Sequence, residues 1–165
     1  MRQQGETYAA FIESELKREH DRRSALDARA IALSTTSSAL LTLVFAITVI
    51  VTGKEYQFSS AGARGLLLSL ALFVVAAVLG LIANVSRKYQ VADRDTLREM
   101  TNGHWTDTEV DARNICAGLS VTTIATLRCG NDFKDDLIRV AFGLQITAIL
   151  GLVVTVGWEL RTTIF

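Results

Sequence analysis

Polar residues inside long apolar runs form the first set whose types and spacing could do chemistry. They are small hydroxyls and two amides: Ser34, Thr35, Ser37, Ser38, Asn84 and Gln145. An amide or hydroxyl that is buried in an apolar medium without a partner costs about 2–7 kcal/mol. Small hydroxyl residues also let helix backbones approach closely. The set therefore predicts either a helix-packing surface or a polar layer that lines a pore.

Basic and aromatic residues that follow the second apolar run form the second set. They are Arg87, Lys88, Tyr89, Arg94, Arg98 and Trp105. Guanidinium groups hold phosphates and aromatic rings stack on planar groups, so the set could bind an anionic, stackable ligand such as a nucleotide. Basic residues beside a membrane also interact with the phosphates of lipid headgroups. The sequence leaves both interpretations open.

Motifs for catalysis and for metal binding are missing from the sequence. It contains no nucleophile elbow and no glycine loop that would cradle a phosphate. The two histidines, His20 and His104, and the two cysteines, Cys116 and Cys129, do not have the spacing of a metal site. We therefore expect a protein that is not an enzyme and has no metal or cofactor, with both thiols reduced in the cytoplasm.

Three apolar runs without formal charge must position the polar residues: Ala30–Thr52, Gly65–Ser86 and Val140–Trp158. A helix of about 20 residues crosses a hydrocarbon core of about 30 Å. The sequence thus predicts an all-α membrane protein, a helical bundle with three transmembrane helices and long helices that extend into the cytoplasm. Its first partner is the lipid bilayer.

The distribution of basic residues predicts the orientation of the chain. Most of them lie before the first run or between the second and third runs, and short basic loops stay in the cytoplasm. We expect a multi-pass protein of the bacterial inner membrane, with the N-terminus inside and the C-terminus outside. Because acidic residues balance the basic ones at a net charge of +0, a nucleic-acid surface is not expected.

The expected segments follow from these runs and charges. They are a charged cytoplasmic helical arm (1–29), transmembrane helix 1 (30–52), an outer hairpin (53–64), transmembrane helix 2 (65–86), a cytoplasmic helical region (87–139), transmembrane helix 3 (140–158) and a short outer tail (159–165). The chain has no proline, so long helices are expected. Whether they continue through Asp27 and Gly130 is open.

The cytoplasmic helices carry apolar residues that indicate a packing partner. Tyr8, Phe11, Ile12 and Leu16 lie along one side of the arm. This stripe predicts packing on the later cytoplasmic segment or on a second copy of the chain. In that later segment the apolar residues Val110, Ala117, Val121, Ile124 and Ala125 lie near one face.

Helix boundaries in the cytoplasmic region are marked by short motifs. Asn102–His104 is expected to end a short helix, and Thr106 with Glu109 forms a capping box that opens the next one. In the spans, Gly80 with Ala76, Ala77 and Ala83 offers a face for close helix approach. Gln145 is predicted to hydrogen-bond the first span or its own copies about a symmetry axis.

Three stretches of this sequence resemble a group of small bacterial membrane proteins. The stretches are LDARAIALSTTSSALLTLVF, GLIANVSRKY and RCGNDFKDDLIRVAFGLQITAIL, and the similar layout spans nearly the whole chain. The group includes the SLATT-type effectors, the transmembrane effectors of Pycsar antiphage systems and similar actinobacterial integral membrane plasmid-transfer (spread) proteins.

The resemblance implies an antiviral defence effector that forms homo-oligomers in the inner membrane. A cyclic nucleotide made by a partner cyclase, or another infection signal, would trigger it to impair the membrane, as in abortive infection. The chain departs from this pattern because it has no separate nucleotide-binding domain, so residues 87–139 or an associated protein would sense the signal. The alternatives are a scaffold for conjugative plasmid transfer and a structural membrane subunit without its own activity.

Overall fold

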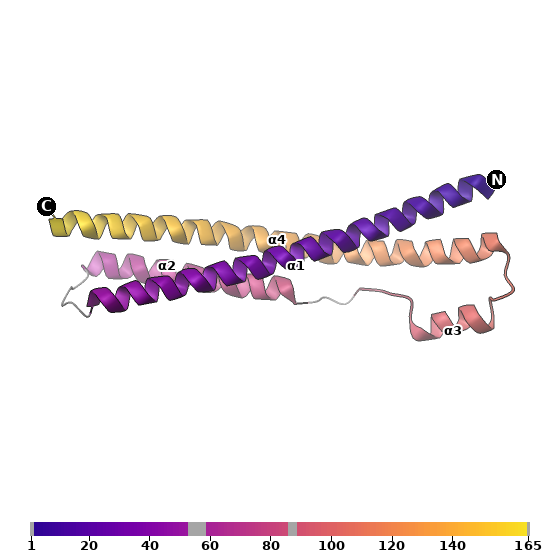
Figure 1. Cartoon of the computed structure of the whole chain (residues 1–165), viewed down its shortest axis with the longest axis horizontal. Helices are drawn as coiled ribbons and strands as arrows, with labels where there is room; N and C mark the ends of the chain where they lie inside the picture. The colour runs from indigo at the N-terminus through magenta and orange to yellow at the C-terminus, as the bar shows by residue number, and fades with distance from the viewer. Residues whose placement is uncertain (1, 53–58, 86–88, 165) are drawn as a thin grey trace. The chain divides into compact units, whose positions relative to one another are not determined.

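Four α-helices make up the computed structural model, which describes residues 2–52, 59–85 and 89–164 (Figure 1). They are α1 (Arg2–Thr52), α2 (Ser60–Asn84), α3 (Arg94–Asn102) and α4 (Glu109–Ile164). The described residues contain no strand, and the prediction of an all-α protein is confirmed. Three helices, α1, α2 and α4, are long and apolar enough to cross a membrane.

The chain divides into two compact units. We call Met1–Leu26 with Ser86–Phe133 the polar unit, and Asp27–Val85 with Lys134–Phe165 the apolar unit. α2 belongs to the apolar unit and α3 to the polar unit, whereas α1 and α4 each contribute to both. Both long helices are thus unbroken at Asp27 and at Gly130, which the sequence left open.

Helix α4 continues through Gly130 although a glycine inside a helix costs about 1 kcal/mol relative to alanine. Its neighbours explain the continuity. Arg128 and Asn131 both donate hydrogen bonds to the carboxylate of Glu19 in α1. These contacts fix the backbone on either side of the glycine, so a local preference for a break is overridden.

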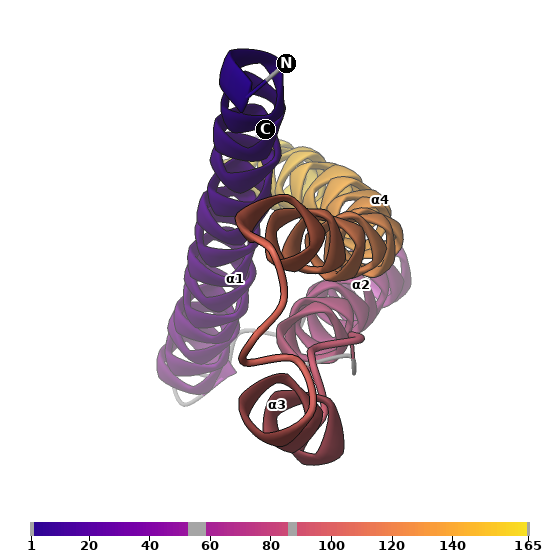
Figure 2. The same cartoon turned by 90° about the vertical axis from the view of Figure 1, so that its right-hand side faces the viewer.

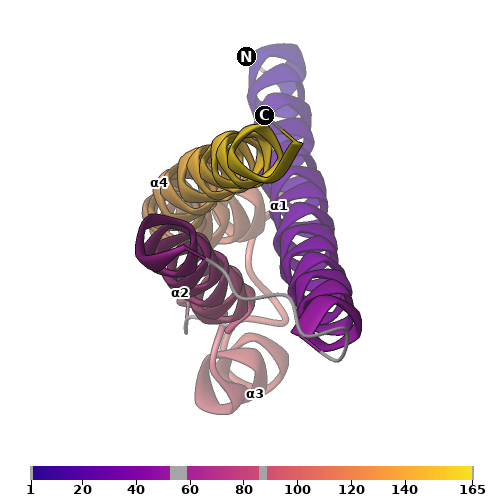
Figure 3. The same ribbon diagram turned by 90° about the vertical axis from the view of Figure 1, so that its left-hand side faces the viewer.

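Helices α1 and α4 run parallel in the apolar unit, and α2 runs against them. Asp27 contacts Lys134 and, further along both helices, Thr36 contacts Gln145. The start of α2 contacts the end of α4, where Ser59 bonds to Glu159. Figure 3 shows these ends of α2 and α4 next to each other.

Small residues form the face that α2 buries. Its buried residues recur at intervals of three and four: Gly62, Ser69, Phe73, Ala76, Gly80 and Ala83. A Cβ on Gly80 would lie 2.5 Å from Ser34 Oγ and 3.3 Å from the backbone oxygen of Ala30. α1 therefore approaches α2 at a distance that only glycine permits, which confirms the predicted close-approach face.

Buried positions along α1 and α4 follow the spacing of a coiled coil. On α4 they are Ile124, Leu127, Asn131, Lys134, Ile138, Ala141, Gln145 and Ala148, at alternating steps of three and four. On α1 they are Glu19, Leu26, Ala30, Leu33, Ser37 and Val44. Steps of three and four keep one seam facing a parallel partner helix. The pattern is hard to see in the sequence because Glu19, Asn131, Lys134 and Gln145 occupy core positions.

The polar unit contains α3 and the loop that leads from it into α4 (Figure 2). α3 ends at Asn102, as predicted, and Gly103 donates its backbone N–H to the oxygen of Glu99. The predicted capping box is wrong by two residues. Thr108, not Thr106, accepts the backbone N–H of Asp111 at 3.3 Å. This register leaves Glu109 in the first turn, where it pairs with Arg113 at 2.7 Å.

Three predicted segment boundaries differ from the ends of the helices. Of the predicted hairpin, residues 53–58 lie outside the described part, while Ser60–Arg64 is already the start of α2. Ser59 caps this helix, because its hydroxyl accepts the backbone N–H of Gly62 at 3.0 Å. At the other end α2 stops at Asn84, and α4 runs beyond the predicted third span to Ile164.

The apolar stripe of the arm is only half packed. Ile12 and Leu16 are partly buried, but Tyr8 is 69% and Phe11 63% exposed. On α4, Ile124 is buried and Ala117 partly so, whereas the remaining predicted face residues, Val110, Val121 and Ala125, are exposed. The α1–α4 seam covers only the positions at steps of three and four, and the predicted packing of the other residues on a second copy stays a prediction.

Candidate functional site: buried polar contacts between α1 and α4

The contact between Gln145 and Thr36 joins a buried side chain of α4 to an exposed residue of α1 in the apolar unit. Gln145 is 8% exposed, and its Nε2 donates to Thr36 Oγ1 at 3.1 Å. The Thr36 hydroxyl in turn donates to the backbone oxygen of Ala32 at 2.9 Å. The amide thus bonds to the predicted first span, which is the first of the two partners expected for it. The two helices are held in register at this level.

An ion pair joins the same two helices nearer to their polar halves. Lys134 Nζ donates to Asp27 Oδ1, and the Lys134 side chain is only 3% exposed while that of Asp27 is about one third exposed. Desolvation of a buried pair offsets most of its Coulomb attraction. The pair therefore adds little net stability, but loss of Asp27 would leave a buried ammonium without its counter-charge.

The run of hydroxyls from Ser34 to Ser38 divides between two helix faces. Ser37 is fully buried, and its hydroxyl has no hydrogen-bond partner among the described residues. Ser34 is partly buried and donates to the backbone oxygen of Ala77 at 3.4 Å. Thr35 and Ser38 are exposed. Consecutive residues turn by about 100° around a helix, so the whole run cannot face one layer.

Asn84 does not belong to this polar layer in the structure. It is the last residue of α2 and is exposed, and no hydrogen bond of its side chain is seen among the described residues. Its position near the inner end of the predicted second span suggested that it lies at the same membrane depth as Gln145. The buried face of α2 follows Ala76, Gly80 and Ala83 instead, and Asn84 is one residue off that face.

Glu19 is the centre of a hydrogen-bonded cluster in the polar unit. Its carboxylate accepts from Arg128 Nε at 2.9 Å and from Asn131 Nδ2 at 3.0 Å. Asn131 Nδ2 also donates to the backbone oxygen of Glu19 at 3.1 Å, and Arg128 Nη2 bonds Glu15 at 2.7 Å. The sequence analysis missed this cluster, because more than a hundred residues separate the partners in the chain.

Hydrogen bonding by Glu19, with the charges of Glu19 and Glu15, raises the pKa of Arg128. A raised folded-state pKa stabilises the fold at every pH below the unfolded value and ceases to do so only as pH rises past it. Arginine is protonated throughout the physiological range. Arg128 therefore keeps its charge in the cluster throughout that range.

The structure does not gather the predicted ligand residues into one site. Arg87 and Lys88 lie outside the described residues. Tyr89 packs under Arg23, whose guanidinium carbon lies 4.7 Å from the ring centroid. Arg94 and Arg98 are exposed on α3, and neither side chain has an ion-pair partner in the described part of the chain. The described members of the set, Tyr89, Arg94, Arg98 and Trp105, do not line a common cavity, and the nucleotide site stays a prediction.

Trp105 lines a different hollow, of about 310 Å³, in the polar unit. His104 and Asp107 line it too, and His104 Nδ1 lies 2.8 Å from Asp107 Oδ2. No arginine or lysine lines this hollow. A phosphate there would meet a carboxylate and no guanidinium, so the hollow does not suit the anionic ligand expected from the sequence.

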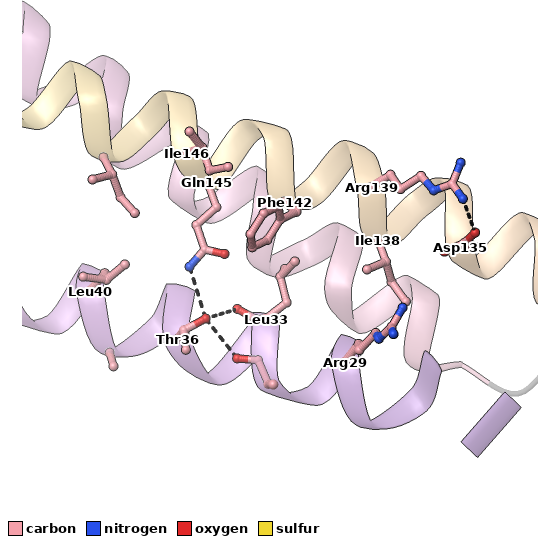
Figure 4. Close-up of a pocket in the computed structure, with 13 residues that line it drawn as sticks. Arg29, Leu33, Thr36, Leu40, Asp135, Ile138, Arg139, Phe142, Gln145 and Ile146 are labelled. Carbon is pink, nitrogen blue, oxygen red and sulfur yellow. Dashed lines mark hydrogen bonds and ion pairs between the residues drawn. The ribbon is translucent and has the colours of Figure 1, made fainter. Parts of the chain in front are cut away.

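A larger groove lies between α1 and α4 of the apolar unit. It measures about 950 Å³, and Thr36 and Gln145 form part of its wall (Figure 4). Arg29, Asp135 and Arg139 lie together at one end. The sequence analysis did not assign this groove, because its two walls come from segments more than a hundred residues apart.

Glu159 forms a further contact that the sequence did not suggest. This residue was expected in the outer tail, but it is buried, and its carboxylate accepts from Ser59 Oγ and, at 3.4 Å, from Ser59 N. Ser59 is the N-cap of α2. A carboxylate is stabilised at a helix N-terminus by the helix dipole. Glu159 therefore ties the end of α4 to the start of α2.

Residues 2–52, 59–85 and 89–164 contain no group of three or more His, Cys, Asp and Glu side chains that could hold a metal ion. Cys116 and Cys129 are free and exposed. Comparisons of the chain with models of protein families, with curated proteins and with solved structures found no match.

Proposed function

We propose that this chain is an inner-membrane effector of a nucleotide-signalled antiphage defence system, which oligomerises and impairs the membrane when it is triggered. The resemblance of its sequence to SLATT-type and Pycsar effectors suggests this role. The observation that carries it is the set of polar side chains in the core of the apolar unit: the Asp27–Lys134 pair, the Thr36–Gln145 bond and the unpartnered Ser37.

Those side chains favour a protein with two states. Ionisable and polar residues inside a membrane are costly, and they mark pathways or switches more often than simple anchors. A buried hydroxyl without a partner costs about 1–3 kcal/mol, so the packed state of Ser37 is not the best that the sequence can reach. In a second state, with α1 moved away from α4, Ser37, Thr36 and Gln145 would bond to water or to neighbouring copies.

Hydration of that polar layer would give a leak. In the proposed resting state helix packing covers Ser37 and most of Gln145, Thr36 is bonded to Gln145, and the membrane stays intact. A signal at the polar unit that weakens the α1–α4 seam would expose them. No ring of charged side chains is needed for this, and the leak would be coarse, without the selectivity that such rings give.

Membrane potential in bacteria with an inducible copy of the gene tests the proposal, read with a voltage-sensitive dye with and without a co-expressed pyrimidine cyclase. We expect depolarisation only when the cyclase is present. Gln145→Leu should abolish the depolarisation, because a leucine side chain cannot hydrogen-bond to water. Ile146→Leu, a neighbouring exposed position, is the matched control and should behave as wild type. A potential that holds in every condition at confirmed expression would contradict the effector role.

A conjugative-plasmid scaffold is the second candidate, and one observation favours it. Tyr8 and Phe11 expose most of their surface on α1 of the polar unit. Exposed aromatic residues are typical anchors for a protein partner. Recovery of transfer proteins with the wild-type chain, but not with Tyr8→Ser/Phe11→Ser, would favour the scaffold, and a leak without any such partner would exclude it.

A further inference from the structure

The groove between α1 and α4 has the length of one bilayer leaflet. Its wall on α1 runs from Arg29 to Leu40, and its wall on α4 from Asp135 to Ile149. At a rise of about 1.5 Å per residue, the α1 wall is about 16 Å long, close to half of a hydrocarbon core of about 30 Å. No residue of α2 lines the groove. A single acyl chain can lie along the helices within it.

The walls of the groove are apolar except at two levels. Ala32, Leu33, Phe142, Ile146 and Ile149 are typical of its surface. Thr36 and Gln145 meet halfway and already bond to each other, so they do not require a ligand. At about 950 Å³ the groove is at the upper end of the roughly 300–1,000 Å³ of small-molecule sites. It is large enough for a lipid chain.

Positive charge lies at one end of the groove only. Arg29 is exposed on α1 and has no ion-pair partner among the described residues. Arg139 on α4 has a side chain that is 73% exposed and pairs with Asp135 at 2.7 Å, which engages only part of its guanidinium. Figure 4 shows all three side chains at this end, beyond Ile138. Two guanidiniums and one carboxylate leave a net positive mouth.

We propose that this groove binds an anionic phospholipid. Its headgroup phosphate is held by Arg29 and Arg139, and one acyl chain lies along Leu33, Phe142 and Ile146. A guanidinium binds a phosphate through two parallel hydrogen bonds, which an uncharged side chain cannot supply. The inference rests on the membrane location in the proposed function, and it is independent of the defence role.

A second copy of the chain is a poorer occupant of the groove. In a membrane, a copy in the same orientation brings its own Arg29 and Arg139 to the same depth. Like charges would then meet at the mouth, where repulsion is costly. A phospholipid brings the opposite charge and the apolar chain together.

Lipid retention by the purified protein tests the proposal. The protein is incubated in mild detergent with phosphatidylglycerol or with phosphatidylcholine, and bound lipid is counted by native mass spectrometry. We expect phosphatidylglycerol to be retained about tenfold more strongly, because the choline ammonium of phosphatidylcholine is repelled by the net positive mouth. Arg29→Gln/Arg139→Gln should remove the preference. Arg94→Gln/Arg98→Gln removes two charges from α3 and should leave it unchanged. Equal retention of both lipids by wild type, or a preference that survives Arg29→Gln/Arg139→Gln, would overturn the site.

Cross-linking decides what occupies the groove. Ile146→Cys, in a chain with Cys116→Ser and Cys129→Ser, is labelled with a photoreactive group in vesicles that contain phosphatidylglycerol. We expect adducts with lipid, and about tenfold fewer with Arg29→Gln/Arg139→Gln added. Adducts between two chains would assign the groove to a second copy and overturn the proposal. Neither readout uses the membrane potential, so failure of the lipid site is distinguishable from failure of the effector role.

Discussion

The polar and apolar units use the same two helices with the same spacing of buried positions, but their cores are stabilised differently. In the polar unit the buried polar group Glu19 accepts several hydrogen bonds from Arg128 and Asn131. In the apolar unit, Gln145 makes one side-chain bond across the interface and Ser37 none. The polar contacts are saturated around Glu19 and sparse around Gln145 and Ser37.

The proposed membrane location would explain the difference between the units. In water, apolar burial drives association and a fully bonded polar cluster can be tolerated at the seam. Between helices in lipid there is no such driving force, so close packing of small residues replaces it. Gly80 against Ser34 and Ala30 is that kind of contact. Few side-chain hydrogen bonds join α1 and α4 around Gln145 and Ser37. Separating the two helices would therefore cost the least free energy in that part of the apolar unit.

Loss of the carboxylate at Asp27 should have the largest effect. Asp27→Leu leaves the buried Lys134 ammonium without its counter-charge, and we expect about 3–5 kcal/mol less stability. Asp27→Leu/Lys134→Leu should recover most of it. The measurement is reversible unfolding in mixed micelles, followed by circular dichroism. If the double variant is as unstable as the single one, the ion pair makes a net contribution to stability beyond offsetting the desolvation of its own charges.

A large side chain at Gly80 should rank next. Gly80→Leu forces atoms into Ser34 and Leu33, and overpacking of this kind costs about 1–3 kcal/mol or more. Gly143→Leu is the matched control, since a Cβ there meets nothing within 4 Å. Thermal denaturation in detergent compares the two. Equal melting temperatures would mean that α1 and α2 do not approach as closely as described.

Loss of the Asn131 side-chain amide should destabilise the hydrogen-bonded cluster around Glu19 in the polar unit. Asn131→Leu removes two hydrogen bonds to Glu19, one of them to its carboxylate, and we expect a loss of about 1.5–3 kcal/mol. Hydrogen exchange of the α4 amides around residue 131 would rise in parallel. If unfolding in micelles and exchange both stayed at wild-type values, the cluster would not stabilise the seam.

Loss of the Gln145 side-chain amide in the apolar unit should cause the smallest loss of stability. Gln145→Leu removes a single bond to Thr36, and side-chain bonds between membrane helices contribute about 0.6 kcal/mol on average. Thr36→Val is the partner control, and the two effects should not add. A loss for Gln145→Leu as large as that for Asn131→Leu would remove the contrast between the units.

Local patterns in the sequence were sufficient for the helices, and they limited the partners of Gln145 to two, of which it contacts the first span. Runs without charge predicted the three apolar helices, and small residues around Gly80 predicted the α2 contact. The parallel seam could not be predicted in the same way. Its polar members, such as Glu19 and Lys134, look like surface residues until the helix opposite is known. The same reason hid the groove and the Glu159 cap.

The start of α4 and the set of ligand residues were harder to predict from the sequence for a different reason. Two overlapping Thr-x-x-acid motifs compete for the start of α4, and local contacts accompany the second: Thr108 caps Asp111, and Glu109 pairs with Arg113 one turn later. Tyr89 and Trp105 looked like one stacking site because they are near in sequence. In the structure each contacts a different set of neighbours, Arg23 for Tyr89 and the His104 hollow for Trp105.

The pairing of Thr36 with Gln145 is the most direct test of the parallel seam. Thr36→Cys/Gln145→Cys, with Cys116→Ser and Cys129→Ser, is treated in membranes with a short bifunctional thiol reagent, and α1 is separated from α4 by a protease site placed in residues 53–58. We predict that the two fragments stay linked, and that they come apart when Gln145→Cys is replaced by Thr147→Cys, which faces away. Links of equal yield in both variants, or links only between separate chains, would contradict the seam.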